Sequence, residues 1–215
     1  MFTISDDKSN RSMSEAKEAI NLKDIIELFS DQKYLLAIAI VFFVNMAVNM
    51  SGYIIVDKII FLGGGVLTIA YRGVIAAGVE VPMMVMGDRV HKKLGSFIMI
   101  LIGVMIHTIQ FVGYFFATSN ITILVITSLQ FISVPFFNIA IKYLLLDMSP
   151  ERLKTTGQMS GPAIMNGVTG IIYPLIVAVV ANTFNVSTPL LLAAVFGLLG
   201  IMFTLLLYNK VRKEK

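Results

Sequence analysis

Three charged side chains lie inside long apolar stretches of the sequence, and they are the first candidates for chemistry. Arg72 and Glu80 share one stretch, and Lys142 lies in another. A charge inside a membrane-spanning helix costs about 2.5–3.5 kcal/mol on insertion scales, so such residues usually face a cavity or a partner. We therefore take Glu80, Arg72 and Lys142 as the candidate substrate or proton site.

Glu80 is the strongest candidate because an intramembrane carboxyl group can exchange a proton or hold a polar solute. The alternative is a structural ion pair with a basic residue such as Lys142, which is expected at a similar depth. Lys142 has a second interpretation, in which it extends to the cytoplasmic headgroups, and Arg72 has one in which backbone carbonyls hold it. Arg72 and Glu80 are separated by about 12 Å along a helix axis, too far for direct contact.

The remaining polar residues of the apolar stretches carry weaker signals. For His107, hydrogen-bonded packing is the default interpretation and a proton relay is the alternative. The amides either bond helices together or line a polar cavity. No set of His, Asp and Glu residues has metal-ligand spacing, no Ser-His-Asp set can be assembled, and cysteine is absent, so we expect no metal, cofactor or enzyme chemistry. The amides are Asn45, Asn49, Gln110, Gln130 and Asn138.

These residues need helices that cross a membrane to position them. The chain has 215 residues, of which 57% are hydrophobic and 14% charged, with a mean hydropathy of +0.84. A soluble domain of this size carries roughly 25% charged residues, and a bilayer core about 30 Å thick needs about 20 apolar residues of helix. The expected spans lie near 34–56, 66–86, 95–117, 121–146, 162–181 and 187–208.

The basic residues predict the orientation of these spans. Fourteen of the 17 basic residues fall in the N-terminal segment, the 87–94 and 147–161 loops and the tail, whereas the opposite loops hold only Lys58. Both termini are therefore expected in the cytoplasm of a multi-pass protein of the cell membrane. The basic residues then reflect topology, and no nucleic-acid partner is expected.

The same pattern divides the chain into a cytoplasmic segment at 1–32, a transmembrane domain at 33–209 and a basic tail at 210–215. The first segment has no apolar run like that of a signal peptide. Residues 24–29 are expected to form either an amphipathic turn or two at the membrane interface or part of a partly ordered, solvated tail. Gly63, Gly64 and Gly65 should free the backbone where the second span begins.

The loop after Glu80 resembles the signature loop of the major facilitator superfamily of transporters. The segment 86–95 reads Met-Gly-Asp-Arg-Val-His-Lys-Lys-Leu-Gly. Asp88, Arg89 and Lys93 match the family pattern, and Lys92 replaces an arginine conservatively. This agreement is the first of three in the chain.

Two further segments support the resemblance. The Glu-Val-Pro sequence at 80–82 and the segment 150–158 are similar to motifs of the sugar-efflux and oligosaccharide–proton symporter branches. Met84 and His91 stand where glycines are expected, which is typical of the degenerate copy of the loop in the C-terminal half. The resemblance covers about residues 22–210.

The resemblance implies an all-α, polytopic fold of six transmembrane helices in two inverted three-helix repeats, which is one half of a major-facilitator bundle. It implies the C-terminal half of a secondary active transporter that moves a sugar, nucleoside or drug-like solute by alternating access, with proton coupling. The expected partners are membrane lipid, the solute, a proton and an N-terminal six-helix half. The alternatives are the membrane half of an ATP-driven transporter, a channel, and a non-transporting subunit or remnant.

The resemblance also gives the signature loop a role in gating. Asp88 and Arg89 are expected to latch the cytoplasmic ends of neighbouring helices through charge-assisted hydrogen bonds. Lys92 and Lys93 belong to the same gating loop. Asp147, at the inner end of the fourth expected span, is the expected partner of Arg89. The alternative is a loop whose basic residues only set topology.

Overall fold

The computed structural model describes residues 22–214, and every regular element among them is a helix. The all-α prediction is confirmed for this part of the chain. The predicted segment 1–32 lies mostly outside the described residues, which begin at Leu22. The elements in order are α2 (Leu22–Ser30), α3 (Gln32–Phe61), α4 (Val66–Phe116), α5 (Asn120–Thr127), α6 (Gln130–Met148), the 3₁₀ helix η1 (Glu151–Leu153), α7 (Lys154–Thr183) and α8 (Thr188–Lys213).

Five of the described helices are long and apolar enough to cross a membrane, which makes the chain a multi-pass membrane protein in architecture. They are α3, α4, α6, α7 together with η1, and α8. The sequence predicts six spans, and the difference arises in two places. The spans expected near 66–86 and 95–117 both fall in α4, and the span expected near 121–146 is divided between α5 and α6.

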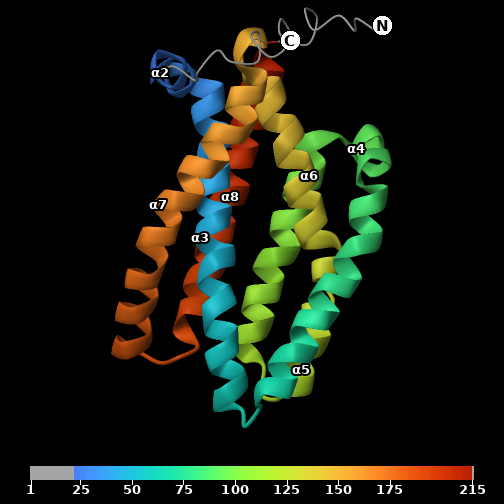
Figure 1. Cartoon of the computed structure of the whole chain (residues 1–215), viewed down its shortest axis with the longest axis vertical. Helices are drawn as coiled ribbons and strands as arrows, with labels where there is room; N and C mark the ends of the chain where they lie inside the picture. Colours follow the sequence, from blue (N-terminus) through green and yellow to red (C-terminus); the bar gives the residue numbers. More distant parts are fainter. Residues whose placement is uncertain (1–21, 215) are drawn as a thin grey trace, which may run out of the picture.

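The longest helix, α4, reverses direction within its length. Gly95 has φ 75° and ψ 164°, a conformation that is open to glycine and strained for other residues. Figure 1 shows α4 rising along one side of the bundle, turning at its end and returning beside α6. We call residues 66–94 the first limb and residues 96–116 the second limb. The loop expected at 87–94 is helical and belongs to the first limb.

Close contact between α3 and α7 depends on two glycines. A Cβ atom on Gly161 would lie 2.3 Å from Ile38 and 2.4 Å from the Tyr34 hydroxyl, so a side chain does not fit there without movement. Tyr34 is fully buried and donates a hydrogen bond of 2.7 Å to the carbonyl of Gly157. Glycines at this spacing allow helices to approach closely. We call this contact, continued along both helices, the α3–α7 seam.

One end of the bundle gathers α2, the turn of α4, the connection from α6 to α7 and the end of α8 (Figure 1). Arg152 pairs there with Asp24 at 2.9 Å and with Glu27 at 2.8 Å, which ties α2 to η1. Lys33 at the start of α3 pairs with Glu214 beyond the end of α8. We call this the basic end, because most of the basic residues expected in cytoplasmic loops lie there.

The opposite end corrects one expectation about Lys58. The sequence places Lys58 in an outer loop, but α3 continues to Phe61 and buries it. The Lys58 ammonium donates a 2.5 Å hydrogen bond to the Phe115 carbonyl near the end of α4, where unpaired carbonyls favour a cation. The predicted glycine turn is present, with φ 77° at Gly63.

Candidate functional site

The first limb of α4 turns Arg72 and Glu80 toward the bundle. Residues 72, 76, 80 and 83 are half-buried and Gly87 is buried, a spacing that marks one helix face. Glu80 makes no ion pair within residues 22–214, and the Nε atom of Arg72 is buried without a hydrogen-bond partner there. A buried donor without a partner lowers stability by about 1–3 kcal/mol. A further hydrogen-bond acceptor, from a ligand or another chain, would remove this cost at Arg72.

Lys142 lies on α6 and is exposed, as is Asn138 one turn before it. It lines a cavity of about 310 Å³ that also contacts Asp88 and Gln158. No ion pair joins Lys142 to Glu80 in the described part of the chain. Of the three predicted site residues, the structure therefore places two on one helix face and the third on α6 beside Asp88.

Asp88, in the segment 86–95, is held against α6 by Tyr143, a residue that the sequence analysis did not single out. The Tyr143 hydroxyl donates a hydrogen bond of 3.1 Å to the Asp88 carboxylate. The His91 ring stacks on the Tyr143 ring, with centroids 3.9 Å apart and planes at 10°. His91 Nε2 also lies 2.8 Å from the Ser96 hydroxyl, across the turn at Gly95. Tyr143 thus fixes the end of the first limb against α6.

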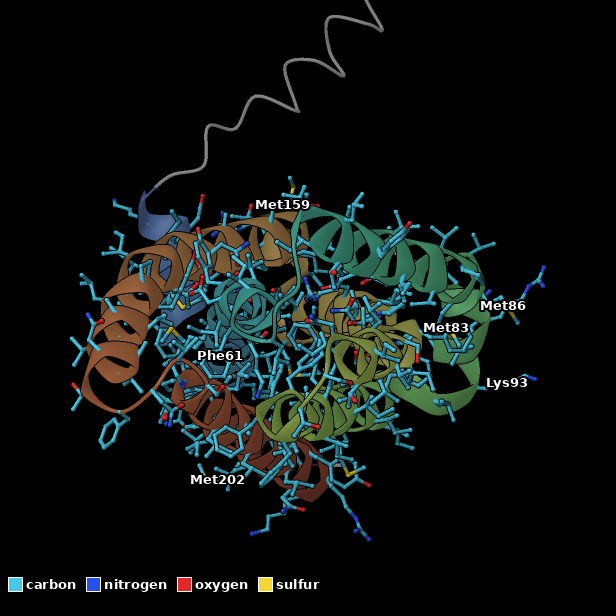
Figure 2. All side chains as sticks on the ribbon, turned by 90° about the horizontal axis from the view of Figure 1, so that it is seen from below. Phe61, Met83, Met86, Lys93, Met159 and Met202 are labelled. Carbon is cyan, nitrogen blue, oxygen red and sulfur yellow. The ribbon has the colours of Figure 1, made fainter. Side chains whose placement is uncertain are left out.

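The basic residues of the same segment are exposed. Arg89, Lys92 and Lys93 form no ion pair within residues 22–214. Figure 2 shows Lys93 projecting away from the bundle at its edge, with Met86 nearby. Exposed cations beside apolar side chains fit the headgroup region of a bilayer.

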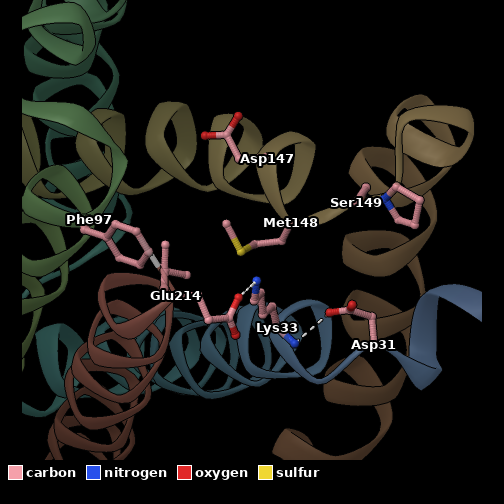
Figure 3. Close-up of a pocket in the computed structure, with 9 residues that line it drawn as sticks. Asp31, Lys33, Phe97, Asp147, Met148, Ser149 and Glu214 are labelled. Carbon is pink, nitrogen blue, oxygen red and sulfur yellow. Dashed lines mark hydrogen bonds and ion pairs between the residues drawn. The ribbon is translucent and has the colours of Figure 1, made fainter.

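Asp147 lies across a separate cavity of about 540 Å³ at the basic end. Figure 3 shows its carboxylate pointing away from the Lys33–Glu214 pair on the other side of that cavity. The structure contains no ion pair between Asp147 and Arg89 among the described residues. The described conformation thus holds Asp88 through Tyr143 and leaves the expected Arg89–Asp147 latch unmade.

A polar stripe on α3 is the main feature that residue-by-residue reading of the sequence missed. Polar residues recur there at every fourth position, which keeps them near one face of a helix. Two of them, Asn45 and Asn49, were predicted to join helices or line a cavity. The α3 polar stripe consists of Asn45, Asn49, Tyr53 and Asp57.

The α3 polar stripe runs along the α3–α7 seam. The Asn45 amide donates a hydrogen bond of 2.6 Å to the Asn166 side-chain oxygen of α7. Further along, the Tyr53 and Tyr173 rings lie 5.4 Å apart at 48°. The four-residue spacing could have revealed the stripe in the sequence, whereas its pairing with α7 requires the fold.

The polar residues of the second limb serve packing in the described structure. His107 is buried and stacks on Phe111 with ring centroids 5.4 Å apart. Gln110 donates hydrogen bonds to the Tyr114 hydroxyl at 2.9 Å and to the Ile126 carbonyl at 3.2 Å. The Gln110 contacts join the second limb to α5, which supports the helix-joining interpretation for this amide. The Nδ1 atom of His107 is buried without a hydrogen-bond partner among residues 22–214.

Comparison with known proteins gives no family for this chain, so its function has to be argued from the site. No protein-family model matches the chain, and no curated protein matches its sequence. Residues 22–214 contain no group of three or more His, Cys, Asp or Glu side chains that could hold a metal ion. The features available for function are thus the α3 polar stripe, the two charges on the first limb and the Asp88–Tyr143 contact.

Proposed function

We propose that this protein is the C-terminal half of a secondary active transporter that moves a small solute by alternating access, with a proton as the coupling ion. The observation that carries the proposal is the α3 polar stripe. It lies on a helix whose other residues are mainly apolar, as in a membrane-spanning helix. Polar side chains within spans usually face the bundle interior or a water-filled cavity. A stripe along one helix therefore favours a solute path.

The exposure of α7 supports a second half that covers this side. In the most apolar window of α7, 6% of the residues are buried, against 39–50% in the other long helices. Figure 1 shows α7 at one edge of the bundle and the first limb of α4 at the other. An N-terminal six-helix half that packs on this side would enclose the α3 polar stripe between the two halves.

Six crossings follow from this proposal if each limb of α4 crosses once and α5 and α6 cross together. A straight helix of 51 residues would be about 76 Å long, more than twice the bilayer core of about 30 Å. The reversal at Gly95 makes two crossings the simpler arrangement. The basic end then lies in the cytoplasm by the positive-inside rule.

Solvent access to the α3 polar stripe tests whether it lines a path. The chain has no cysteine, so single-cysteine variants can be labelled in native membranes with a charged, membrane-impermeant thiol reagent. We expect Asn49→Cys to react, and Leu198→Cys, on an exposed apolar face of α8, to resist. Equal resistance at both positions would show that the stripe only joins helices.

Glu80 is the residue proposed to exchange the proton. With the N-terminal half present, solutes added to inverted vesicles should evoke proton movement that a pH-sensitive dye reports, across a panel of sugars, nucleosides and organic cations. Glu80→Gln should abolish this movement yet keep solute exchange, whereas Glu151→Gln, an exposed control at the basic end, should retain both. The proposal fails if no solute in the panel moves protons.

A further inference from the structure

The outer part of the α3 polar stripe forms an open groove of about 550 Å³. The lining side chains are one amide, one tyrosine, one carboxylate and two valines, and Gly52 contributes no side chain. A Cβ atom on Gly52 would meet nothing within 4 Å, so the middle of the groove is open space. The lining residues are Val48, Asn49, Gly52, Tyr53, Val56 and Asp57.

The groove carries a negative charge that no cation of the described chain neutralises. Asp57 is exposed and forms no ion pair within residues 22–214. Its neighbour Lys58 turns inward, where it donates to the Phe115 carbonyl and lies 5.8 Å from the centre of the Phe115 ring. Arg72 lies on the first limb of α4, on the other side of α3 from α7 (Figure 1).

The groove residue Tyr53 belongs to an aromatic pair with Tyr173 of α7. Tyr53 is 62% exposed and lies one helical turn before Asp57. Tyr173 approaches it from α7 with the ring planes tilted by 48°, so the pair forms a partly open aromatic corner. Aromatic faces attract cations electrostatically, and they bury the apolar body of a ligand as well.

We infer that this groove binds an organic cation with an apolar or aromatic body. The Asp57 carboxylate would hold the positive charge, the Tyr53 and Tyr173 rings the body, and the Asn49 amide a polar substituent. A sugar site would need polar groups on several sides, whereas the two valines and the Tyr53 ring make most of this lining surface apolar. The inference rests on the proposed function, because it names the class of solute that the transporter half would take.

Tryptophan fluorescence gives a direct test, because the chain contains no tryptophan. Tyr173→Trp keeps an aromatic ring beside Tyr53, at the edge of the groove, and provides a single reporter. The full chain is placed in phosphatidylcholine nanodiscs and titrated with tetraphenylphosphonium, a cation with an aromatic body. We expect a saturable fluorescence change. In Asp57→Asn the affinity for the cation should be weaker by about tenfold or more, as for loss of a charged contact. Equilibrium dialysis of the labelled cation with the unmodified chain checks that the reporter has not created the site.

The controls separate binding in the groove from partition into lipid. Glu151→Gln removes a carboxylate at the basic end and should leave the affinity unchanged, and neutral triphenylphosphine oxide should bind more weakly than the cation. A signal that does not saturate, or that Asp57→Asn leaves unchanged, overturns the inference. Proton movement evoked by sugars or nucleosides but never by organic cations overturns this inference alone. Cation binding without any solute-evoked proton movement overturns the proposed function alone.

Discussion

Replacing Gly161 by alanine should loosen the α3–α7 seam. The added methyl group would lie 2.4 Å from the Tyr34 hydroxyl and 2.3 Å from Ile38, and Tyr34 is fully buried. Overpacking of this kind costs about 1–3 kcal/mol, and loss of the Tyr34–Gly157 hydrogen bond adds about 0.5–1.5 kcal/mol. The better helix propensity of alanine returns at most about 1 kcal/mol. The expected net loss of unfolding free energy is thus about 0.5–3.5 kcal/mol.

The matched control is Gly170→Ala in the same helix. A Cβ atom on Gly170 meets nothing within 4 Å, so this variant should be as stable as the unmodified chain or slightly more so. Reversible unfolding by sodium dodecyl sulfate in mixed micelles, followed by circular dichroism, gives the two free energies under identical conditions.

A second substitution tests the cause of the loss. Tyr34→Phe removes the hydroxyl that the new methyl group would strike, so it should destabilise the Gly161→Ala variant less than it destabilises the unmodified chain. The two substitutions should therefore be non-additive by more than about 0.5 kcal/mol. If Gly161→Ala proves as stable as Gly170→Ala, the close approach of α3 and α7 is refuted.

Three further predictions concern orientation, the seam and α2. Single cysteines at Lys93 and Asn185 should be labelled from opposite sides of the membrane, and labelling from one side would refute the proposed topology. Asn45→Val and Asn166→Val should each lower the unfolding free energy by about 0.6–1.7 kcal/mol, whereas additive losses in the double variant would show that the amides do not interact. Arg152→Gln should speed amide exchange in α2, and unchanged exchange would show that its two ion pairs do not hold that helix.

The sequence predicted the all-α class and the apolar stretches, because hydrocarbon imposes a strong constraint on composition and length. It did not predict how these stretches are divided among the long helices. It also predicted the glycine turn at 63–65, where Gly63 has the positive φ that favours glycine. The end of α3 was missed. Apolar composition stops near Asp57 and Lys58, but the buried carbonyl of Phe115 allows the helix to continue.

The candidate site was only partly predictable because its contacts join distant segments. Nothing near Tyr143 in the sequence indicates that its hydroxyl reaches Asp88. The absence of an Arg89–Asp147 pair likewise depends on how the first limb of α4 lies against α6 in this conformation. The α3 polar stripe is different, because its four-residue spacing is local and a test for polar periodicity would have found it.

The α3–α7 seam is narrow at the basic end and wide at the opposite end. Gly157 and Gly161 bring α7 against Tyr34 at the basic end, and Figure 1 shows α7 diverging from α3 toward the opposite end. The groove with Asp57 lies in the wide part, and Asp88 is held by Tyr143 on the side of the narrow part. Under the proposed function, both belong to one state, closed toward the cytoplasm and open to the other side. Alternating access would then require α7 to move away from α3 at Gly161 and toward it at Tyr53, so the two glycines are the contacts that transport must break.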